Sequence, residues 1–501
     1  MTNTESAYRY FHENAPYGDV WQILSDSIAV RRGDGRQDPQ GLEIPRGYRW
    51  FFGAERLGAG EEKQIVLRVC GQVYACRLRC TPPPGEQVYL CGDGVCAELS
   101  LSDTVFTKIT GGVYEADMRR EKPDGSVREK VACIRRYIAS KGFLYPEGLI
   151  ENMYLCLRSK PFVLLAGISG TGKTRLVRLF AEALGATAEN GRYRMVSVRP
   201  DWSDPSDLTG RVDINGRFIP GAVSELIKKA QDDPDHPYFL CLDEMNLARV
   251  EYYLSDFLSV IETRTRKNGR ISTVPLMQDT VFGTDQAARE AYGGVTLGGN
   301  LYVIGTVNMD ETTFPFSRKV LDRAHTVEFS DVRLNVLPAP AEEVKPLDVG
   351  NDFLEASYLT LQECPAHNGR LQAICDRLET LNGILRKAGA HVGYRVRDEI
   401  VFYLLCGMAS GLLGEDEAFD NELMQKILPR IQGSGASRKR MLGELFRFAG
   451  GDYRRMEGSS EALQMAAYLK KTGGSRYPKS AEKIRYMTGR LEEDGFTSYW
   501  L

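Results

Sequence analysis

A glycine-rich segment carries the strongest chemical signal in the chain. GISGTGKT, Gly167 to Thr174, matches the pattern G-x-x-x-x-G-K-[ST] and lies between a short apolar run and an amphipathic stretch. Glycines in such a loop let backbone N–H groups surround a phosphate, and the start of the next helix adds partial positive charge. Lys173 is expected to reach the β- and γ-phosphates, and Thr174 to bind Mg²⁺. The expected phosphate-binding residues are Gly167, Ser169, Gly170, Thr171, Gly172, Lys173 and Thr174.

Two carboxylates follow a second apolar run. The segment YFLCLDEMN reads as a buried strand that ends in Asp243 and Glu244. Asp243 is expected to bind Mg²⁺ through water, and Glu244 to orient or deprotonate the attacking water. The plainer interpretation is a strand that ends in a solvated acidic turn, but the preceding P-loop favours the catalytic one.

A polar residue closes a third apolar run. LYVIGTVNMDETT places Asn308 at a strand end, where an amide can orient water beside a γ-phosphate. This strand is expected between the two strands that carry the other motifs. An asparagine there can also be a simple turn former.

Two arginine-bearing segments follow. In SRKVLDRAHTVEF, Arg318 or Arg323 could reach the nucleotide of a neighbouring subunit, and we prefer Arg323. In HVGYRVRDEI, Arg395 or Arg397 could contact the γ-phosphate from the side of a helical lid, and we prefer Arg395. The alternative for each is a solvated arginine on a helix.

The elements that must position these residues indicate an α/β fold. Short apolar strands alternate with helical stretches, which predicts a parallel sheet sandwiched by helices. Helical patterns dominate from about Pro346 onward, and alternating patterns with turn signals dominate the first part of the chain. We therefore expect three domains: a β-rich domain over 1–130, a nucleotide-binding α/β domain over 131–340, and a helical lid with a C-terminal helical region over 341–501.

Composition sets broad limits. The 501 residues are 43% apolar and 26% charged with a net charge of −3, which is typical of a globular protein with no overall attraction to nucleic acid. No apolar run is long enough to span a membrane, and the first residues lack signal-peptide features, so a cytoplasmic location is expected. Five of the eleven cysteines lie between Cys70 and Cys96, but their spacing fits no zinc motif.

Together the motifs resemble the McrB-type branch of AAA+ proteins, the motor subunits of modification-dependent restriction systems. The resemblance is strong over about residues 135–335, including VRPDWSDPSDLTG and CLDEMNLARVEYYLSDFLSVIETR, and weak through the helical end. It implies Mg²⁺, a homo-hexameric ring with nucleotide at subunit interfaces, and a separate McrC-type nuclease that the ring activates.

The chain departs from the best-known members in one respect. Those members prefer GTP and carry an Asn-Thr-Ala-Asp tetrad, whereas this chain has Asn308, Met309, Asp310 and Glu311. The P-loop contacts the phosphates, which ATP and GTP share, and not the base. The motif therefore leaves open which of the two nucleotides the protein prefers. The alternative function is a MoxR-like AAA+ chaperone that remodels a protein target.

The first 130 residues are expected to read the target. IPRGYRWFFGAER groups Tyr48, Trp50, Phe51 and Phe52 with arginines, a set that could stack on a flipped base or a single strand of DNA. The plainer interpretation is a hydrophobic strand of a small β-fold. The chain shows no convincing nuclease motif of its own, so DNA cleavage would require a partner.

Overall fold

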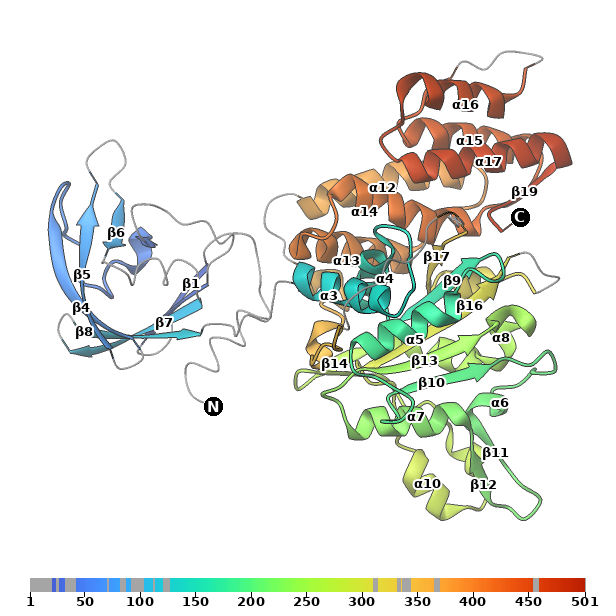
Figure 1. Cartoon of the computed structure of the whole chain (residues 1–501), viewed down its shortest axis with the longest axis horizontal. Helices are drawn as coiled ribbons and strands as arrows, with labels where there is room; N and C mark the ends of the chain where they lie inside the picture. The colour runs from blue at the N-terminus through green and yellow to red at the C-terminus, as the bar shows by residue number, and fades with distance from the viewer. Residues whose placement is uncertain are drawn as a thin grey trace. The chain divides into compact units, whose positions relative to one another are not determined.

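The computed structural model describes residues 20–23, 27–31, 42–69, 72–81, 87–91, 103–110, 113–119, 127–309, 314–330, 335, 344–364, 370–453 and 459–500. The chain divides into two compact units (Figure 1). The first comprises Met1–Asp124 with Pro365–His367, and the second comprises Gly125–Cys364 with Asn368–Leu501. The second unit contains both regions for which we expected separate α/β and helical domains, so those boundaries remain a prediction.

The first unit is built on one eight-stranded sheet, in the order β1-β2-β7-β8-β4-β5-β6-β3. The sequence predicts a hairpin around residue 72, and β4 and β5 confirm it because Val69 pairs with Gln72 in an antiparallel register. The strands are β1 (Val20–Ile23), β2 (Ser27–Arg31), β3 (Leu42–Ile44), β4 (Glu62–Val69), β5 (Gln72–Cys80), β6 (Val88–Cys91), β7 (Asp103–Thr110) and β8 (Val113–Arg119).

The aromatic segment of this unit belongs mainly to its core. Phe52 packs edge-on against Phe106 and also contacts Tyr114, and Phe51 is buried beside them. Of the aromatic side chains grouped in the sequence, Trp50 is the exposed one, at 47%. Phe51 and Phe52 therefore belong to the core of the β-fold and cannot stack on a base. They lie in turns after the 3₁₀ helix η1 (Arg46–Tyr48), so the strand that the plainer interpretation expected here is wrong.

The second unit contains a five-stranded parallel sheet in the order β10-β13-β16-β9-β17. Four of its strands are those predicted from the apolar runs, and β16 lies between β13 and β9 as expected. The fifth, β17, was not predicted. The strands are β9 (Phe162–Gly167), β10 (Tyr193–Ser197), β13 (Tyr238–Asp243), β16 (Leu301–Asn308) and β17 (His325–Glu328).

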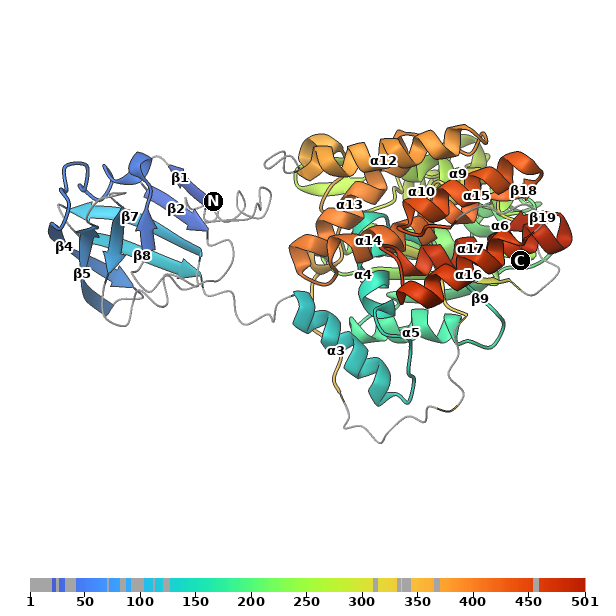
Figure 2. The same ribbon diagram turned by 90° about the horizontal axis from the view of Figure 1, so that it is seen from above.

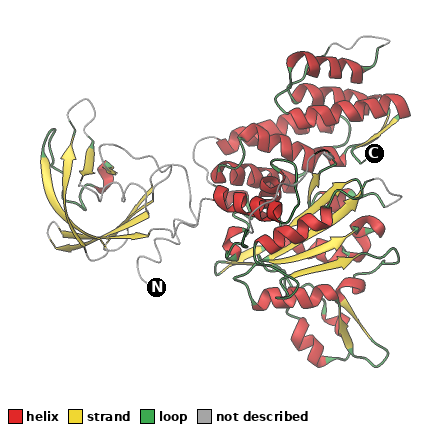
Figure 3. Cartoon of the chain, in the orientation of Figure 1, coloured by secondary structure: helices red, strands yellow, loops and turns green. Residues whose placement is uncertain are grey.

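Both faces of this sheet are covered by helices (Figure 3), which is why its strands are apolar throughout. Alternate residues of β9 belong to different cores: Val163 and Leu165 face one, and Phe162 and Leu164 face the other. The first face is covered by α3 (Val127–Ser140), α4 (Leu149–Ser159) and α5 (Lys173–Ala183), with α3 beside α5 (Figure 2). The second is covered by α7 (Ala222–Asp232), α8 (Val250–Tyr253), α9 (Ser255–Val260) and α11 (Arg318–Leu321).

Apolar residues recur at helical spacing from Leu247 to Ile261, which predicts one helix here, but in the structure this stretch is broken. The structure has a 3₁₀ turn, η2 (Met245–Leu247), followed by the short helices α8 and α9, which meet at Leu254. Its apolar positions are nevertheless buried as expected, including Val250, Phe257 and Leu258. The remaining elements of this region are α6 (Ser206–Thr209), α10 (Gln286–Tyr292), η3 (Ile261–Thr263), η4 (Asp279–Phe282) and the strand pairs β11 (Gly210–Val212) with β12 (Phe218–Pro220) and β14 (Thr265–Lys267) with β15 (Arg270–Ser272).

The C-terminal part is helical, as predicted. Its elements are α12 (Arg370–Arg386), α13 (Tyr394–Ser410), α14 (Glu415–Glu422), the π-helix η7 (Leu423–Ile427), the 3₁₀ turn η8 (Leu428–Arg430), α15 (Ala436–Phe448), α16 (Glu461–Thr472), α17 (Pro478–Asp494) and the strand pair β18 (Gln432–Ser434) with β19 (Phe496–Ser498).

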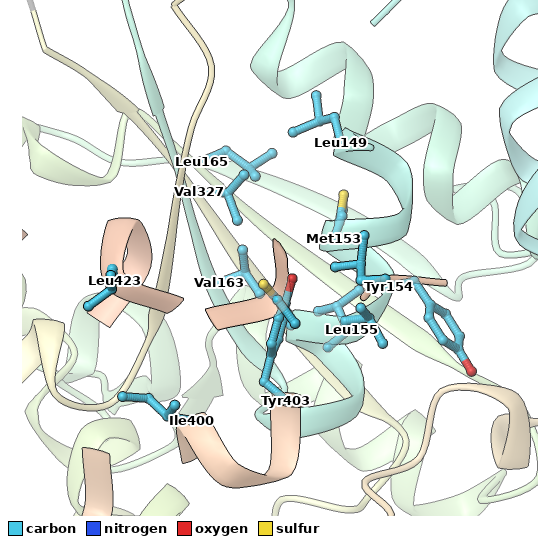
Figure 4. Close-up of a cluster of buried hydrophobic side chains, with 14 of the residues drawn as sticks. Leu149, Met153, Tyr154, Leu155, Val163, Leu165, Val327, Ile400, Tyr403 and Leu423 are labelled. Atoms are coloured by element: carbon cyan, nitrogen blue, oxygen red, sulfur yellow. The ribbon is translucent and has the colours of Figure 1, made fainter. Parts of the chain in front are cut away.

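This helical part shares a core with the sheet. Ile400 and Tyr403 of α13 lie in one cluster with Met153 of α4 and with Val163 and Val327 of the sheet (Figure 4). The lid and the α/β region therefore do not pack as independent bodies. None of the described helices is both long and apolar enough to cross a membrane.

Candidate functional site

The parallel register brings the three motifs to one edge of the sheet. Gly167 at the end of β9 pairs with Asn308 at the end of β16, and Leu242 of β13 pairs with Gly305 of β16. Carboxyl ends of parallel strands meet at the same edge, where ligands bind in open α/β sheets. The chain thus places the P-loop, the carboxylates after β13 and the Asn308 amide around one position.

The chain of the P-loop changes direction at two glycines whose backbone φ angles are positive, in the left-handed region. Gly170 and Gly172 have φ of 82° and 86°, which a residue with a side chain rarely adopts. The buried ammonium group of Lys173 donates to the carbonyls of Gly167 at 3.0 Å and Ile168 at 2.7 Å. Its charge is therefore held inside the loop that is expected to receive the phosphates.

A tyrosine outside the motif supports this loop. The hydroxyl of Tyr145 donates to the carbonyl of Gly172 at 3.0 Å, and burial raises the pKa of this phenol. A methyl group at Gly172 would lie 3.2 Å from that hydroxyl oxygen. The sequence gives no signal for this contact, because Tyr145 precedes the motif by more than twenty residues.

The residues expected to hold Mg²⁺ contact each other directly. The Thr174 hydroxyl donates to Asp243 Oδ1 at 2.5 Å, and the Thr306 hydroxyl donates to the same oxygen at 2.8 Å. Hydroxyl and carboxylate oxygens are the ligand types that Mg²⁺ takes in proteins, so this donor set fits the ion. Thr306, which is buried inside β16, is a site residue that the sequence analysis missed.

Glu244 has an unusual backbone conformation. Its φ is 54°, in the left-handed region where residues other than glycine are uncommon. Its backbone N–H donates to Thr306 Oγ1 at 2.9 Å, and Asn308 Nδ2 donates to its carboxylate at 3.3 Å. Strain of this kind clusters at active sites, where surrounding contacts maintain it. Two contacts across β13 and β16 thus fix the direction of this carboxylate.

The arginines lie at the opposite edge of the sheet. His325 pairs with Val163, so Arg323 is level with the residues before β9, six positions from Gly167. At about 3.3 Å per residue this separates Arg323 from its own P-loop by about 20 Å. Arg323 Nε lies 3.8 Å from Glu262 Oε1. Arg323 is thus not placed to reach the nucleotide of its own chain.

Arg395 lies with Arg323 and not over the P-loop. Its Nε lies 2.5 Å from Glu262 Oε2, and Lys160 at the start of β9 pairs with the same carboxylate at 2.9 Å. Contact between Arg395 and a γ-phosphate from the lid of the same chain therefore does not fit this arrangement. Of the two residues that we did not prefer, Arg318 donates to the carbonyl of Gly389, and Arg397 pairs with Asp398.

A cavity of about 740 Å³ adjoins the P-loop. It lies beside Ile168, between the start of α4, the ends of β16 and β17, and α17. Its polar lining includes Asn421, Gln425, Glu482 and Lys483. This is enough space for the nucleoside half of a nucleotide whose phosphates lie in the loop.

This combination of sheet order, P-loop and strand-end carboxylates defines an AAA+ nucleotide-binding domain. Residues 162–324 match the family model for the AAA domain of the dynein-related subfamily, and residues 343–496 match a domain of unknown function, DUF8727. The "Type IV methyl-directed restriction enzyme EcoKMcrB subunit" of Escherichia coli strain K12 is 23% identical over 291 residues, which cover 57% of this chain and 56% of that protein. The P-loop region is therefore an AAA+ domain, and the chain is similar to this McrB subunit over a little more than half of its length.

A solved structure from Cytophaga hutchinsonii, proposed to be an ATPase, is 16% identical and aligns with a TM-score of 0.37 over 60% of this chain and 89% of its own. The fold assignment depends on the sheet itself and on the family match. The chain spans only about half the length of its McrB relative.

Proposed function

We propose that this protein hydrolyses ATP or GTP with Mg²⁺ at the carboxyl edge of its parallel sheet. The observation that carries the proposal is a set of three contacts to the acidic residues at the end of β13: Thr174 of α5 and Thr306 of β16 donate to Asp243, and Asn308 of β16 donates to Glu244. Lys173 would bind the β- and γ-phosphates, and Thr174 with Asp243 would hold Mg²⁺, which would neutralise charge on the phosphates. Glu244 accepts a proton from the attacking water, and Asn308 keeps its carboxylate directed at that water.

The arginine positions support a ring of like subunits. Arg323 and Arg395 lie together at the edge of the sheet opposite their own P-loop, so both serve the nucleotide of the adjacent subunit. A guanidinium delivered in this way stabilises charge on the transferring phosphoryl group. Heterologous contacts that repeat this geometry form a ring when the rotation between neighbouring subunits closes, and the resemblance to McrB favours a homo-hexamer.

The McrB relationship also favours a nuclease partner. We propose that the ring activates a McrC-like subunit and acts in defence against modified foreign DNA, with the β-rich first unit as the DNA reader. The relative is described as a subunit of a methyl-directed restriction enzyme. The second candidate function is that of a MoxR-like chaperone. A neighbouring gene for a nuclease would favour the restriction function, and one for a von Willebrand-type protein would favour the chaperone.

The test is a turnover assay with ATP and GTP in parallel, with and without modified duplex DNA. The proposal expects Mg²⁺-dependent turnover of at least one nucleotide. Removal of residues 1–124 should abolish DNA binding and leave turnover largely intact. Normal binding of modified duplexes by the truncated protein would exclude the first unit as the reader.

A further inference from the structure

A buried lysine of the lid contacts the segment that carries Arg323. Lys426 belongs to the π-helix η7, and its side chain is 0% exposed. Its ammonium donates to the carbonyl of Ala324 at 2.9 Å and to that of Asp322 at 3.5 Å. These are the residues on either side of Arg323. Single turns of π-helix occur frequently at functional sites, and this one directs a cation from the lid at the backbone of the arginine segment.

A second lid cation holds the same segment. Arg430 of η8 lies four residues after Lys426, and its Nε is 2.7 Å from Asp322 Oδ1. Arg430 is buried, with 6% of its side chain exposed, and Asp322 is partly buried, with 27% exposed. Lys426 and Arg430 therefore fix the turn that carries Arg323 through its backbone and through a neighbouring side chain.

The contacts of Lys426 continue in a chain of ion pairs that leads to the side chain of Arg323. Glu399 of α13 pairs with Lys426 through Oε2 at 2.5 Å and with Lys160 through Oε1 at 2.8 Å. Lys160 pairs in turn with Glu262, the carboxylate that also contacts Arg323. Arg323 is thus restrained at both ends, with its main chain beside Lys426 and its guanidinium beside Glu262.

A network of this kind is better suited to positioning than to stability. Desolvation of buried charges offsets much of their attraction, so a buried ion pair is weak evidence for a stabilising role. Geometry matters more at a trans-acting arginine, because a misplacement of about 1 Å in a reacting group can cost about 100-fold in rate. Both Lys426 and Glu399 belong to the helical lid. Their ion pairs therefore make the position of Arg323 depend on the position of the lid.

We propose that Lys426, assisted by Arg430, is a positioning residue that sets Arg323 for the nucleotide of the adjacent subunit. Through this contact the lid of one subunit controls hydrolysis in the next. The inference rests on the proposed function, in which Arg323 acts in trans.

The test is a directional complementation with the full-length protein. Lys426→Met alone should reduce kcat at least tenfold with little change in KM, and Lys426→Arg should recover part of the loss. Lys471→Met, on an exposed position of α16, is the matched control and should keep the wild-type rate. Thermal unfolding of each variant checks that it is folded.

Mixtures then identify which side of the interface fails. Lys426→Met retains its own P-loop and Glu244, so equal mixing with Glu244→Gln should restore turnover at about a quarter of the interfaces in a ring of heterologous contacts. Mixing with Arg323→Ala should restore nothing, because neither subunit then delivers a competent arginine.

Three results would overturn the inference. The first is a wild-type rate for Lys426→Met alone. The second is that turnover recovers when Lys426→Met is mixed with Arg323→Ala but not with Glu244→Gln. The third is that turnover recovers in neither mixture. The mixture of Arg323→Ala with Glu244→Gln is the reference, since it tests the trans action of Arg323 alone. If this reference also fails to recover, the error lies in the proposed function and not in the role of Lys426.

Discussion

The side-chain amide of Asn308 donates to the carboxylate of Glu244 at 3.3 Å, from the end of one parallel strand to the end of its neighbour. The contact joins two residues separated by more than sixty positions in the chain. It holds the carboxylate of the proposed base at the edge of the sheet where the P-loop begins, because Asn308 also pairs with Gly167.

Glu244→Gln should uncouple binding from turnover. The glutamine keeps the size and one oxygen of the side chain but cannot accept a proton, and general-base catalysis contributes about 10²–10⁴-fold. We therefore expect kcat to fall by about that factor while the nucleotide Kd changes little, with the nucleotide-bound assembly accumulating. Equilibrium binding and steady-state turnover measure the two effects. Glu290→Gln, on the exposed helix α10, is the control, and turnover by Glu244→Gln equal to that of the control would refute the assignment.

Thr306→Val tests a site residue that the motifs do not reveal. Valine has nearly the same shape but removes the hydroxyl that donates to Asp243 and accepts from the Glu244 N–H. Without this hydroxyl the Glu244 N–H and the Asp243 carboxylate each lose a hydrogen bond that positions them, so kcat should fall about ten- to hundredfold. Thr306→Ser retains the hydroxyl and should stay near wild type. Equal rates for the valine and serine variants would show that the hydroxyl is dispensable.

Arg323→Ala should abolish turnover while each site still binds nucleotide. An arginine supplied to a transferring phosphoryl group contributes about 10³–10⁵-fold in kcat, and Arg323 lies too far from its own P-loop to affect binding there. Arg318→Ala is the matched control on the same segment, because Arg318 contacts only the carbonyl of Gly389 among the described hydrogen-bond partners. A wild-type rate for Arg323→Ala would exclude it as the trans-acting arginine.

Glu399→Gln should destabilise the second unit at neutral pH. Burial opposes ionisation of Glu399, but Lys160 and Lys426 hold the pKa of its carboxyl well below the ordinary value of 4.5. The stability that its charge contributes is therefore present above about pH 4.5 and is lost as the pH falls further through the folded-state pKa. Removing one partner of a buried ion pair costs about 3–5 kcal/mol.

The measurement is urea unfolding of both proteins at a series of pH values. The free energy of unfolding of the wild type should exceed that of Glu399→Gln by its full amount at pH 7, and this difference should decrease only below pH 4.5. Glu417→Gln, an exposed position in α14, controls for the loss of a carboxylate elsewhere. If the difference in the free energy of unfolding already disappears between pH 7 and pH 5, the pKa of Glu399 is not lowered in the folded protein.

Local patterns were sufficient to predict much of the α/β region. Each motif lies where an apolar run meets polar residues, and that arrangement can be read directly from the chain, as with Asp243 after β13. The fully apolar strands also indicated a sheet covered on both faces, which the two cores around β9 confirm.

The contacts between distant segments could not be predicted in the same way. Tyr145 supports Gly172, and Lys426 reaches the carbonyl of Ala324 from a hundred residues away. Neither residue belongs to a motif, and a buried lysine looks in sequence like any solvated one. The position of Arg395 beside Glu262 likewise depends on how the lid docks, which periodicity does not encode.

In the proposed function, Lys173 and the acidic residues at the end of β13 form one nucleotide-hydrolysing site. The most direct measurement is turnover of ATP and GTP, with and without Mg²⁺, by the wild type and by Lys173→Ala. We predict Mg²⁺-dependent hydrolysis of at least one nucleotide by the wild type, and neither binding nor hydrolysis by the variant. Hydrolysis by Lys173→Ala at the wild-type rate, or no hydrolysis of either nucleotide by the wild-type protein, would show that this site does not hydrolyse nucleotides.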